Sequence, residues 1–480
     1  MDLIVSNGTI VTATDTYRAD LGIDGGRIIQ IGAALDPRSA ARVLDATDRL
    51  VLPAGVDVHT HFDTKSGPTT TRDDYRTGTL AAACGGTTTI INFLRQEKGQ
   101  TFADVIDHYH ARARGQAAID YGFHVVVADA SKGSLAELGS LPGRGITSFK
   151  VYMAYKGVLM IDDETMLGVL EAARRDGALV MVHAENGDAA SFLQQRYLAA
   201  GKTEPKYHAA SRPPRLEAEA TARAITLAET VGAPVYFVHV SCAEAIEEIE
   251  RGRARGIEVY AETCGHYLHF TEADLDRPNF EGAKWVYTPP ARAEQQVSAV
   301  WRALANGSLQ VVSSDHCPYD FVGQKDIGRD DFTRIPNGAP GVEERLLAVY
   351  QGVVDGRIGA NRFVELVSTQ PAKLFGLYPR KGTIAVGSDA DLVLWDPRLE
   401  WTVTSSALHH AVDYTLYEGR RVRGAAETVT LRGRVIVDKR RYVGRAGDGE
   451  FIARERFAAR PGAGARLGVG EEDASKGLRP

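Results

Sequence analysis

Gly55-Val56-Asp57-Val58-His59-Thr60-His61 joins an apolar run to two histidines spaced two residues apart. On a β-strand this spacing points both imidazoles to the same face. Two imidazoles at the end of a buried strand make half of a metal site. Because such a pair can also arise by chance, it is weak evidence alone, and the sequence must supply further ligands elsewhere if the site is real.

Short apolar runs recur after His61, and segments of helical character separate them. The first run and its successors predict strands at 56–59, 87–93, 122–128, 146–152, 178–183, 235–240, 257–262 and 309–315. Segment 215–231, for example, has small apolar residues at helical spacing. Eight strands alternating with helices predict an α/β fold, a (β/α)₈ TIM barrel, whose chemistry sits at the C-terminal ends of the strands. An open doubly wound sheet is the alternative, disfavoured because no glycine-rich nucleotide loop follows an early strand.

Both ends of the chain have β character instead. Residues 3–6 and 9–12 flank Asn7-Gly8, which predicts a hairpin with a two-residue turn, and a second hairpin is predicted around Asp24-Gly25-Gly26. A short helix is predicted from Gln370, with Gly376 as its stop, and strands follow at 391–395, 428–431 and 434–437. We therefore expect both ends to combine into one small β-sandwich. The predicted division is 1–52 and 379–458 for the sandwich, 53–378 for the barrel, and 459–480 for a flexible tail or oligomerisation arm.

The composition is that of an ordinary globular enzyme. Of the 480 residues, 44% are hydrophobic and 25% are charged, with a formal net charge of −6. There is no block of Lys and Arg and no apolar run of membrane-spanning length, so neither nucleic acid nor a membrane is expected as a partner. The four cysteines are far apart without a Cys-x-x-Cys pair, and the N-terminus does not read as a signal peptide. These features predict a cytoplasmic protein with reduced thiols.

Metal-ligating side chains stand at or near the ends of five predicted strands. They are His59, His61, Lys150, His183, His239 and Asp315. Taken singly, a histidine there is more often a hydrogen-bonded core residue, the aspartate could cap a helix and the lysine could extend to solvent. Six suitable residues at one end of one barrel outweigh those readings. A lysine among apolar neighbours is costly unless it is paired or modified, and reaction of its neutral amine with CO₂ would give a carbamate with two ligand oxygens.

The motifs taken together resemble the cyclic amidohydrolase branch of the amidohydrolase superfamily, and within it the dihydropyrimidinases and hydantoinases. The resemblance covers the chain from the first predicted hairpin to about residue 440. The matching runs are Val58-His59-Thr60-His61, Phe149-Lys150, Met153-Ala154-Tyr155-Lys156-Gly157, His183-Ala184-Glu185-Asn186, Val238-His239-Val240-Ser241, Ser314-Asp315-His316-Cys317-Pro318, Gly328-Arg329-Asp330-Asp331-Phe332 and Ile335-Pro336-Asn337-Gly338.

The resemblance implies a centre of two divalent metal ions per subunit, usually Zn²⁺. His59, His61 and Asp315 would hold one ion, His183 and His239 the other, and carbamylated Lys150 would bridge them. Imidazoles and carboxylates suit zinc and leave open positions for water.

The same resemblance assigns roles in hydrolysis of a cyclic amide. Activated water would attack the ring carbonyl, and Asp315 would carry its proton to the departing ring nitrogen. Tyr155 would stabilise the oxyanion, and backbone groups near Thr288 and Asn337 would hold the amide edge of the ring. The substrate would be a small molecule, a dihydropyrimidine or a 5-substituted hydantoin, opened to an N-carbamoyl amino acid. The family likeness further suggests a homotetramer.

Other activities remain as alternatives. An allantoinase or cyclic imidase could use the same scaffold, whereas a dihydroorotase is a poor match because Asp63 stands where those enzymes carry a substrate-clamping arginine. A non-catalytic relative, like the dihydropyrimidinase-related scaffold proteins, would have lost metal ligands that this chain keeps. Lys65 and Leu159 stand where hydantoinases often carry apolar or aromatic lid residues. We therefore expect this lid to tolerate polar substituents.

Overall fold

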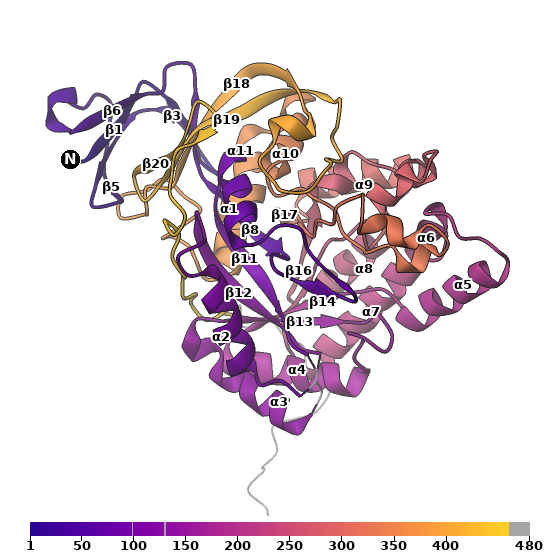
Figure 1. Ribbon diagram of the computed structural model, residues 1–480. Coiled ribbons are helices and arrows are strands. Elements are labelled where there is room, and N and C mark those ends of the chain that lie inside the picture. The colour runs from indigo at the N-terminus through magenta and orange to yellow at the C-terminus, as the bar shows by residue number, and fades with distance from the viewer. Residues whose placement is uncertain (98, 129–130, 460–480) are drawn as a thin grey trace, which may run out of the picture.

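The computed structural model describes residues 1–97, 99–128 and 131–459. Its centre is a parallel eight-stranded sheet (Figure 1), as predicted. Its strands in chain order are β8 (Gly55–Thr60), β11 (Thr87–Arg95), β12 (Asp120–Val126), β13 (Ser148–Tyr152), β14 (Leu179–His183), β15 (Val235–Phe237), β16 (Val259–Cys264) and β17 (Val311–Ser313). The eighth strand returns to the first, because the Ser314 amide donates to Asp57 Oδ1 at 3.1 Å and Thr60 forms a parallel bridge with His316. The sheet therefore closes into a barrel.

The barrel strands are apolar on both faces, which explains why their sequences read as continuous apolar runs. In β14, Leu179 and Met181 belong to the cluster inside the barrel, whereas Val180 and Val182 belong to the cluster that includes the surrounding helices. Successive residues of a strand point to opposite faces, so both faces need apolar side chains when both are covered.

Helices alternate with the barrel strands and lie outside them (Figure 1). They are α1 (Tyr75–Cys84), α2 (Phe102–Ala113), α3 (Lys132–Glu137), α4 (Asp163–Asp176), α5 (Gly187–Ala199), α6 (Lys206–Ala210), α7 (Pro214–Val231), α8 (Ala243–Ala254), α9 (Glu294–Asn306), α10 (Arg345–Val354), α11 (Ala360–Val364) and α12 (Gln370–Leu374). The predicted helix at 215–231 is α7, and Gly232 ends it with φ of 64°. No helix among the described residues is both long and apolar enough to cross a membrane.

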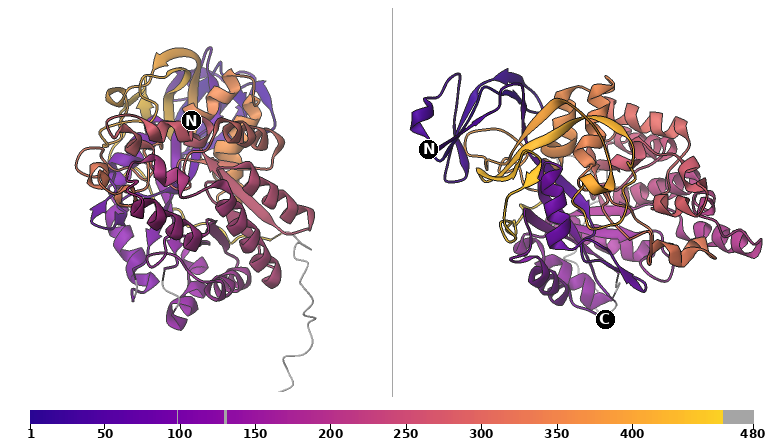
Figure 2. Two further views of the ribbon diagram at one scale, coloured as in Figure 1. Left: turned by 90° about the vertical axis from the view of Figure 1, so that its right-hand side faces the viewer. Right: turned by 45° about the horizontal axis from the view of Figure 1, so that its top comes forward.

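The two ends of the chain build the predicted sandwich beside the barrel (Figures 1 and 2). One sheet has the order β5-β4-β1-β6 and the other β21-β20-β19-β18-β7-β2-β3. Their strands are β1 (Leu3–Ser6), β2 (Thr9–Val11), β3 (Thr16–Arg18), β4 (Asp20–Asp24), β5 (Arg27–Gly32), β6 (Arg42–Asp45), β7 (Leu50–Pro53), β18 (Leu392–Thr402), β19 (Arg421–Leu431), β20 (Arg434–Asp438) and β21 (Arg441–Tyr442). β7 pairs with β18, so the N- and C-terminal parts share one sheet. The exact domain limits stay a prediction, and nearly all of the proposed tail at 459–480 lies outside the described residues.

The first predicted hairpin is wrong. β1 pairs with β4 and β6, whereas β2 pairs with β3 and β7 in the other sheet. Asn7 turns the chain with φ of 65°, and its amide donates to Asp20 Oδ1 at 3.0 Å. At Gly8 a Cβ atom would lie 2.4 Å from the Val51 side chain, so glycine lets the chain pass closely from one sheet to the other. The second hairpin is confirmed, because β4 and β5 pair around Gly25 and Gly26.

Candidate metal centre and active site

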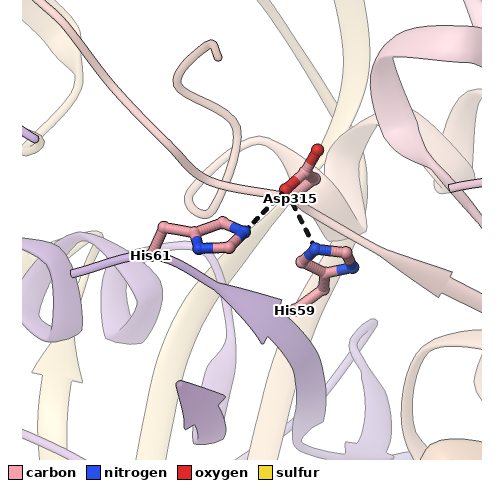
Figure 3. A group of neighbouring side chains, drawn as sticks. All are labelled: His59, His61 and Asp315. Atoms are coloured by element: carbon pink, nitrogen blue, oxygen red, sulfur yellow. Dashed lines mark ion pairs between the residues drawn. The ribbon is translucent and has the colours of Figure 1, made fainter. Parts of the chain in front are cut away.

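His59 and His61 converge on one oxygen of Asp315 (Figure 3). His59 lies in β8, His61 follows that strand, and Asp315 lies just beyond β17, so strand closure brings the three together. The imidazole Nε2 atoms lie 3.1 Å and 3.2 Å from Asp315 Oδ1. One atom of each residue lies within 4.8 Å of the others, which a single metal ion could bind together.

The partners of His59 leave a lone pair facing Asp315. Its Nδ1 lies against Glu262 Oε1, and Tyr236 donates its hydroxyl to Glu262 Oε2 at 2.8 Å. If Nδ1–H donates to this carboxylate, Nε2 carries a lone pair and faces a second acceptor, Asp315, with no hydrogen bond between them. Burial lowers the pKa of His59, but Asp315 and Glu262 together outweigh it and raise the pKa above its usual value. A site that attracts a proton in this way also fits a metal ion.

A second pair of imidazoles lies beside the first group. His183 ends β14, His239 follows β15, and His183 Nδ1 lies 2.9 Å from His239 Nε2. The rings of His59 and His239 are 5.4 Å apart between centroids. His183 Nε2 lies 2.8 Å from Glu185, which is ion-paired with Arg212 at 2.8 Å. Because Glu185 accepts at Nε2, His183 Nδ1 is left as a ligand atom.

Both imidazoles of this second pair are held neutral. Burial lowers the pKa of His183, and it lowers the pKa of His239 to well below the usual value. His239 Nδ1 is buried and has no hydrogen-bond partner among the described residues. Neutral imidazoles are the form that binds metal, so the His183–His239 pair fits a divalent ion beside the first group.

Lys150 lies in β13 among apolar side chains. It is fully buried, and its Nζ has no hydrogen-bond partner within the part of the chain that the structure describes. The rings of Phe93 and Tyr152 lie 4.8 Å and 5.1 Å from Nζ. Burial, opposed by the charges of Asp315 and Glu262, lowers the pKa of Lys150 to about 8. An amine in these surroundings is easily neutral and therefore nucleophilic.

One cavity of about 550 Å³ contains the candidate site. Of the nine residues predicted for the site, eight line it and Lys150 does not: His59, His61, Tyr155, His183, His239, Thr288, Asp315 and Asn337. The structure therefore brings the predicted residues together around one space, while their roles stay predictions.

Tyr155 is placed as a hydrogen-bond donor in this cavity. Burial raises its pKa to about 12, although Arg212 and a hydrogen bond with Thr288 act in the opposite direction. Its phenol therefore keeps its proton at neutral pH. The Arg212 guanidinium lies 5.7 Å from the centroid of the Tyr155 ring, and the ring lies 5.3 Å from that of His183.

Three of these residues have an unusual backbone conformation. Tyr155, His239 and Asp315 have φ values of 63°, 42° and 48°, in the left-handed region that favours glycine. Such residues persist only where the surroundings fix them, and they are enriched at active sites. In each case the turn at the barrel mouth positions a cavity-lining side chain.

Sequence reasoning did not single out Glu262 or Glu185, the two carboxylates that orient the histidines. A sequence signal exists for both. Glu262 is a charged residue inside an otherwise apolar predicted strand, and Glu185 follows His183 by two residues.

Cys84, Glu343 and His409 form another group of ligand-type atoms away from this site. There Glu343 accepts from the His409 amide at 2.6 Å and lies 2.7 Å from its Nδ1, so the pair is satisfied without an ion.

Comparisons with known proteins agree with this geometry. Residues 50–435 match the model of the amidohydrolase family. The D-hydantoinase of Ralstonia pickettii is 57% identical over 95% of this chain and 100% of its own length. That of Rhizobium radiobacter is 55% identical over the same shares of the two chains.

A solved structure gives the same result for the fold. The crystal structure of dihydropyrimidinase from Brevibacillus agri superimposes with a TM-score of 0.94 at 50% identity, covering 96% of this chain and 100% of the other. The match extends over the barrel and the sandwich alike. This chain therefore belongs to the amidohydrolase family and, within it, to the group of dihydropyrimidinases and hydantoinases.

Proposed function

We propose that this protein is a metal-dependent cyclic amidohydrolase that opens dihydropyrimidines or 5-substituted hydantoins to N-carbamoyl amino acids. The observation that carries the proposal is the convergence of His59 and His61 on Asp315, in a cavity that also contains the His183–His239 pair. The names of the relatives, D-hydantoinase and dihydropyrimidinase, support this substrate class and favour the D-enantiomer.

Two divalent ions complete the proposed site, with zinc as the expected metal. One would be held by His59, His61 and Asp315, the other by His183 and His239, since imidazole nitrogen and carboxylate oxygen suit zinc. When bound, the ions supply a Lewis acid that polarises the amide and allows water to act as a nucleophile at neutral pH.

Lys150 is proposed to carry a carbamate. The neutral amine would attack CO₂, form an N–C bond and release one proton, which gives an anionic group with two oxygens for the two ions. Its full burial, the lack of a hydrogen-bond partner for Nζ among the described residues, and its lowered pKa of about 8 support this reaction. Protein incubated with isotope-labelled bicarbonate and zinc should show one labelled carbon on Lys150 that is lost on acidification. An unlabelled lysine in metal-loaded protein would contradict the proposal.

The chain's own groups then move the protons and hold the ring. Asp315 Oδ1 faces both imidazoles, so Oδ2 is left to accept the proton of the attacking water and to return it to the departing ring nitrogen. Tyr155, protonated at neutral pH, would donate to the developing oxyanion. Backbone groups near Thr288 and Asn337, which line the same cavity, would bind the amide edge.

A substrate panel with the protein purified without chelator tests the proposal. Hydantoins and dihydrouracil should lose their ring absorbance, and metal analysis should give two equivalents per chain. Asp315→Asn should lower kcat by about 1,000-fold, within the range of general acid–base effects, while much of the metal stays bound. Equal turnover by the variant would refute the proton transfer, and hydrolysis of allantoin or cyclic imides alone would favour those alternatives. A chain that binds no metal and opens no ring would be a non-catalytic relative.

The assembly and location follow from the family likeness alone. We propose a homotetramer in the cytoplasm. Sedimentation velocity at micromolar concentration should give the mass of four chains, and a monomer there would contradict it.

A further inference from the structure

Arg95 brings a positive charge to the cavity. It is the last residue of β11, it is partly buried, and it is among the residues that line the cavity. Its Nη1 donates to the backbone oxygen of Lys65 at 2.7 Å, in the hairpin of β9 (Lys65–Ser66) and β10 (Thr69–Thr70). The guanidinium therefore reaches from the barrel strand to a hairpin whose turn also lines the cavity.

The strand geometry places Arg95 outward from the metal-ligand site. Phe93 precedes it by two residues, so both side chains leave the same face of β11. The Phe93 ring lies 4.6 Å from the ring of His59 and 5.1 Å from that of His61. Two residues of strand span about 7 Å. The backbone of Arg95 therefore lies one two-residue strand repeat closer to the cavity mouth than that of Phe93, whose ring contacts the candidate ligands.

Among the described residues, no carboxylate lies within ion-pair distance of Arg95. Of its five guanidinium N–H groups, one donates a hydrogen bond there, to the Lys65 carbonyl. Two other cations at the cavity are balanced, since Arg212 pairs with Glu185 at 2.8 Å and Lys156 with Asp188 at 2.5 Å. Arg334 also lines the cavity without an ion pair among the described residues, but it is exposed, whereas Arg95 is partly buried.

The remaining lining gives Arg95 no acidic neighbour. Among the described residues that line the cavity, Asp315 is the only acidic one, and it faces the two histidines.

We propose that Arg95 binds a carboxylate on the ring substituent, so that the enzyme prefers hydantoins with a short carboxyalkyl arm at C5. The products would be N-carbamoyl derivatives of acidic amino acids. The planar guanidinium matches a carboxylate through two parallel N–H···O bonds, and Arg95 follows by about 7 Å of strand the Phe93 ring that contacts His59 and His61. The inference rests on the proposed function, because it assigns the substituent of the same substrate.

The test compares two substrates of equal size, 5-(2-carboxyethyl)hydantoin and its neutral amide 5-(2-carbamoylethyl)hydantoin. The readout is the ratio of their kcat/KM values, in which general effects on folding or metal loading cancel. The wild type should favour the acid, and Arg95→Gln should lower the ratio by about tenfold, as expected for a charge-assisted hydrogen bond at a partly exposed site. Arg95→Lys should give an intermediate ratio, because it keeps the charge and loses the planar fork.

Lys156→Gln is the matched control, since it removes a cavity cation that Asp188 already balances. The ratio should not change in this variant. An Arg95→Gln ratio equal to that of the wild type would overturn the inference, and so would an equal fall in Lys156→Gln.

A measurement on the wild type alone gives a second test if Arg95→Gln does not fold. Raising sodium chloride from 50 to 500 mM should lower kcat/KM for the acid more than for the amide, because salt screens a partly exposed ion pair. An unchanged ratio would overturn the inference. If neither compound nor any other cyclic amide is opened, the proposed function itself fails. If the amide is opened and the acid shows no charge-dependent preference, only the assignment of Arg95 fails.

Discussion

Glu262 orients His59 before any metal binds. Its Oε1 lies against His59 Nδ1, and its Oε2 accepts from the Tyr236 hydroxyl at 2.8 Å, so the carboxylate is fixed from two sides. All three side chains are buried. An imidazole held in this way has its tautomer and ring orientation set, which makes its other nitrogen a stronger ligand.

Glu262→Gln should therefore lower metal affinity with little change in side-chain volume. An amide is a weaker acceptor than a carboxylate, and loss of such a partner typically costs 10- to 100-fold in affinity. Competition with a chromogenic chelator measures the change. Glu343→Gln is the control, because it alters a similar Glu–His pair at His409 that lines a different cavity. Equal affinities of Glu262→Gln and wild type would show that the Glu262 contact does not support the ligand.

The sequence predicts which side chains stand at the ends of the barrel strands, but it does not predict the carboxylates that orient them. His59, His183 and Lys150 stand in or at the ends of apolar runs that the sequence marks as strands, so barrel topology alone predicts that they converge. Glu262 contacts His59 across 203 positions of sequence. No local pattern encodes that contact, because it depends on where β16 meets the interior of the closed barrel.

At the scale of single elements, a small hairpin lines part of the cavity. β9 and β10 pair as Thr69 with Ser66 and Thr70 with Lys65, and Gly67 takes φ of 56° in their turn. Gln324 holds this hairpin from another loop, since its Nε2 donates to the Thr70 carbonyl at 2.8 Å and to the Thr69 hydroxyl. Arg95 holds the first strand of the hairpin through the Lys65 carbonyl at 2.7 Å, and Gln324 holds the second strand.

Gln324→Ala should therefore raise KM by about three- to tenfold and leave kcat nearly unchanged. The reason is that each lost hydrogen bond frees the hairpin by about 1 kcal/mol, while the ligand residues on the barrel strands are not touched. Steady-state kinetics gives both constants, and hydrogen exchange at 65–70 reports the mobility. Gln351→Ala is the control, because Gln351 also donates to backbone carbonyls, at Leu347 and Arg423. A KM equal to that of the wild type would exclude the hairpin from substrate binding.

The elements differ in how well their sequence predicts them. The turn at Gly25-Gly26 forms the expected hairpin because β4 and β5 are neighbours in one sheet. Asn7-Gly8 has the same local signature, yet the flanking strands separate because each finds other partners, β4 and β6 on one side and β3 and β7 on the other. Turn chemistry specifies local backbone direction, whereas the choice of sheet depends on which apolar faces are available to pack.

At the scale of the whole molecule, a buried ionic cluster joins the barrel to the sandwich. Lys381 Nζ lies 2.7 Å from Asp120 at the start of β12, 3.0 Å from Asp389 and 2.6 Å from Asp391 next to β18. Arg432, which follows β19, also binds Asp120. Burial opposes the charge of Lys381, but the three carboxylates outweigh it and raise its pKa.

Lys381→Met should destabilise the whole protein by about 3–5 kcal/mol, because it leaves buried carboxylates without their cation. The midpoint of thermal unfolding should fall by several degrees. Lys373→Met is the control, since Lys373 is exposed, its Nζ lies over the face of Tyr378 at 5.0 Å, and it has no ion pair among the described residues. A midpoint unchanged by Lys381→Met would show that the cluster does not hold the two parts together.

His410 joins the C-terminal segment to the barrel by a second buried contact, and this one predicts a pH dependence. Its Nε2 lies 3.5 Å from Glu344 Oε1. Burial lowers the pKa of His410, but Glu344 and Glu343 outweigh it and raise the pKa to about 9. The unfolded value is about 6.5, so the stabilisation is complete below that pH and is lost as the pH rises through 9.

The unfolding midpoint of the wild type should therefore fall between pH 7 and 9.5, with a loss of about 2–3 kcal/mol from this group at most. His410→Gln should start lower at pH 7 and show a shallower fall, because its side chain does not titrate. His269→Gln serves as the control, since burial lowers the pKa of His269 to about 4 and keeps it neutral throughout this range. Other groups also titrate at alkaline pH, but they are shared by all three proteins and cancel in the difference. If His410→Gln and wild type lose stability in parallel, His410 does not carry the stabilising positive charge in the folded protein.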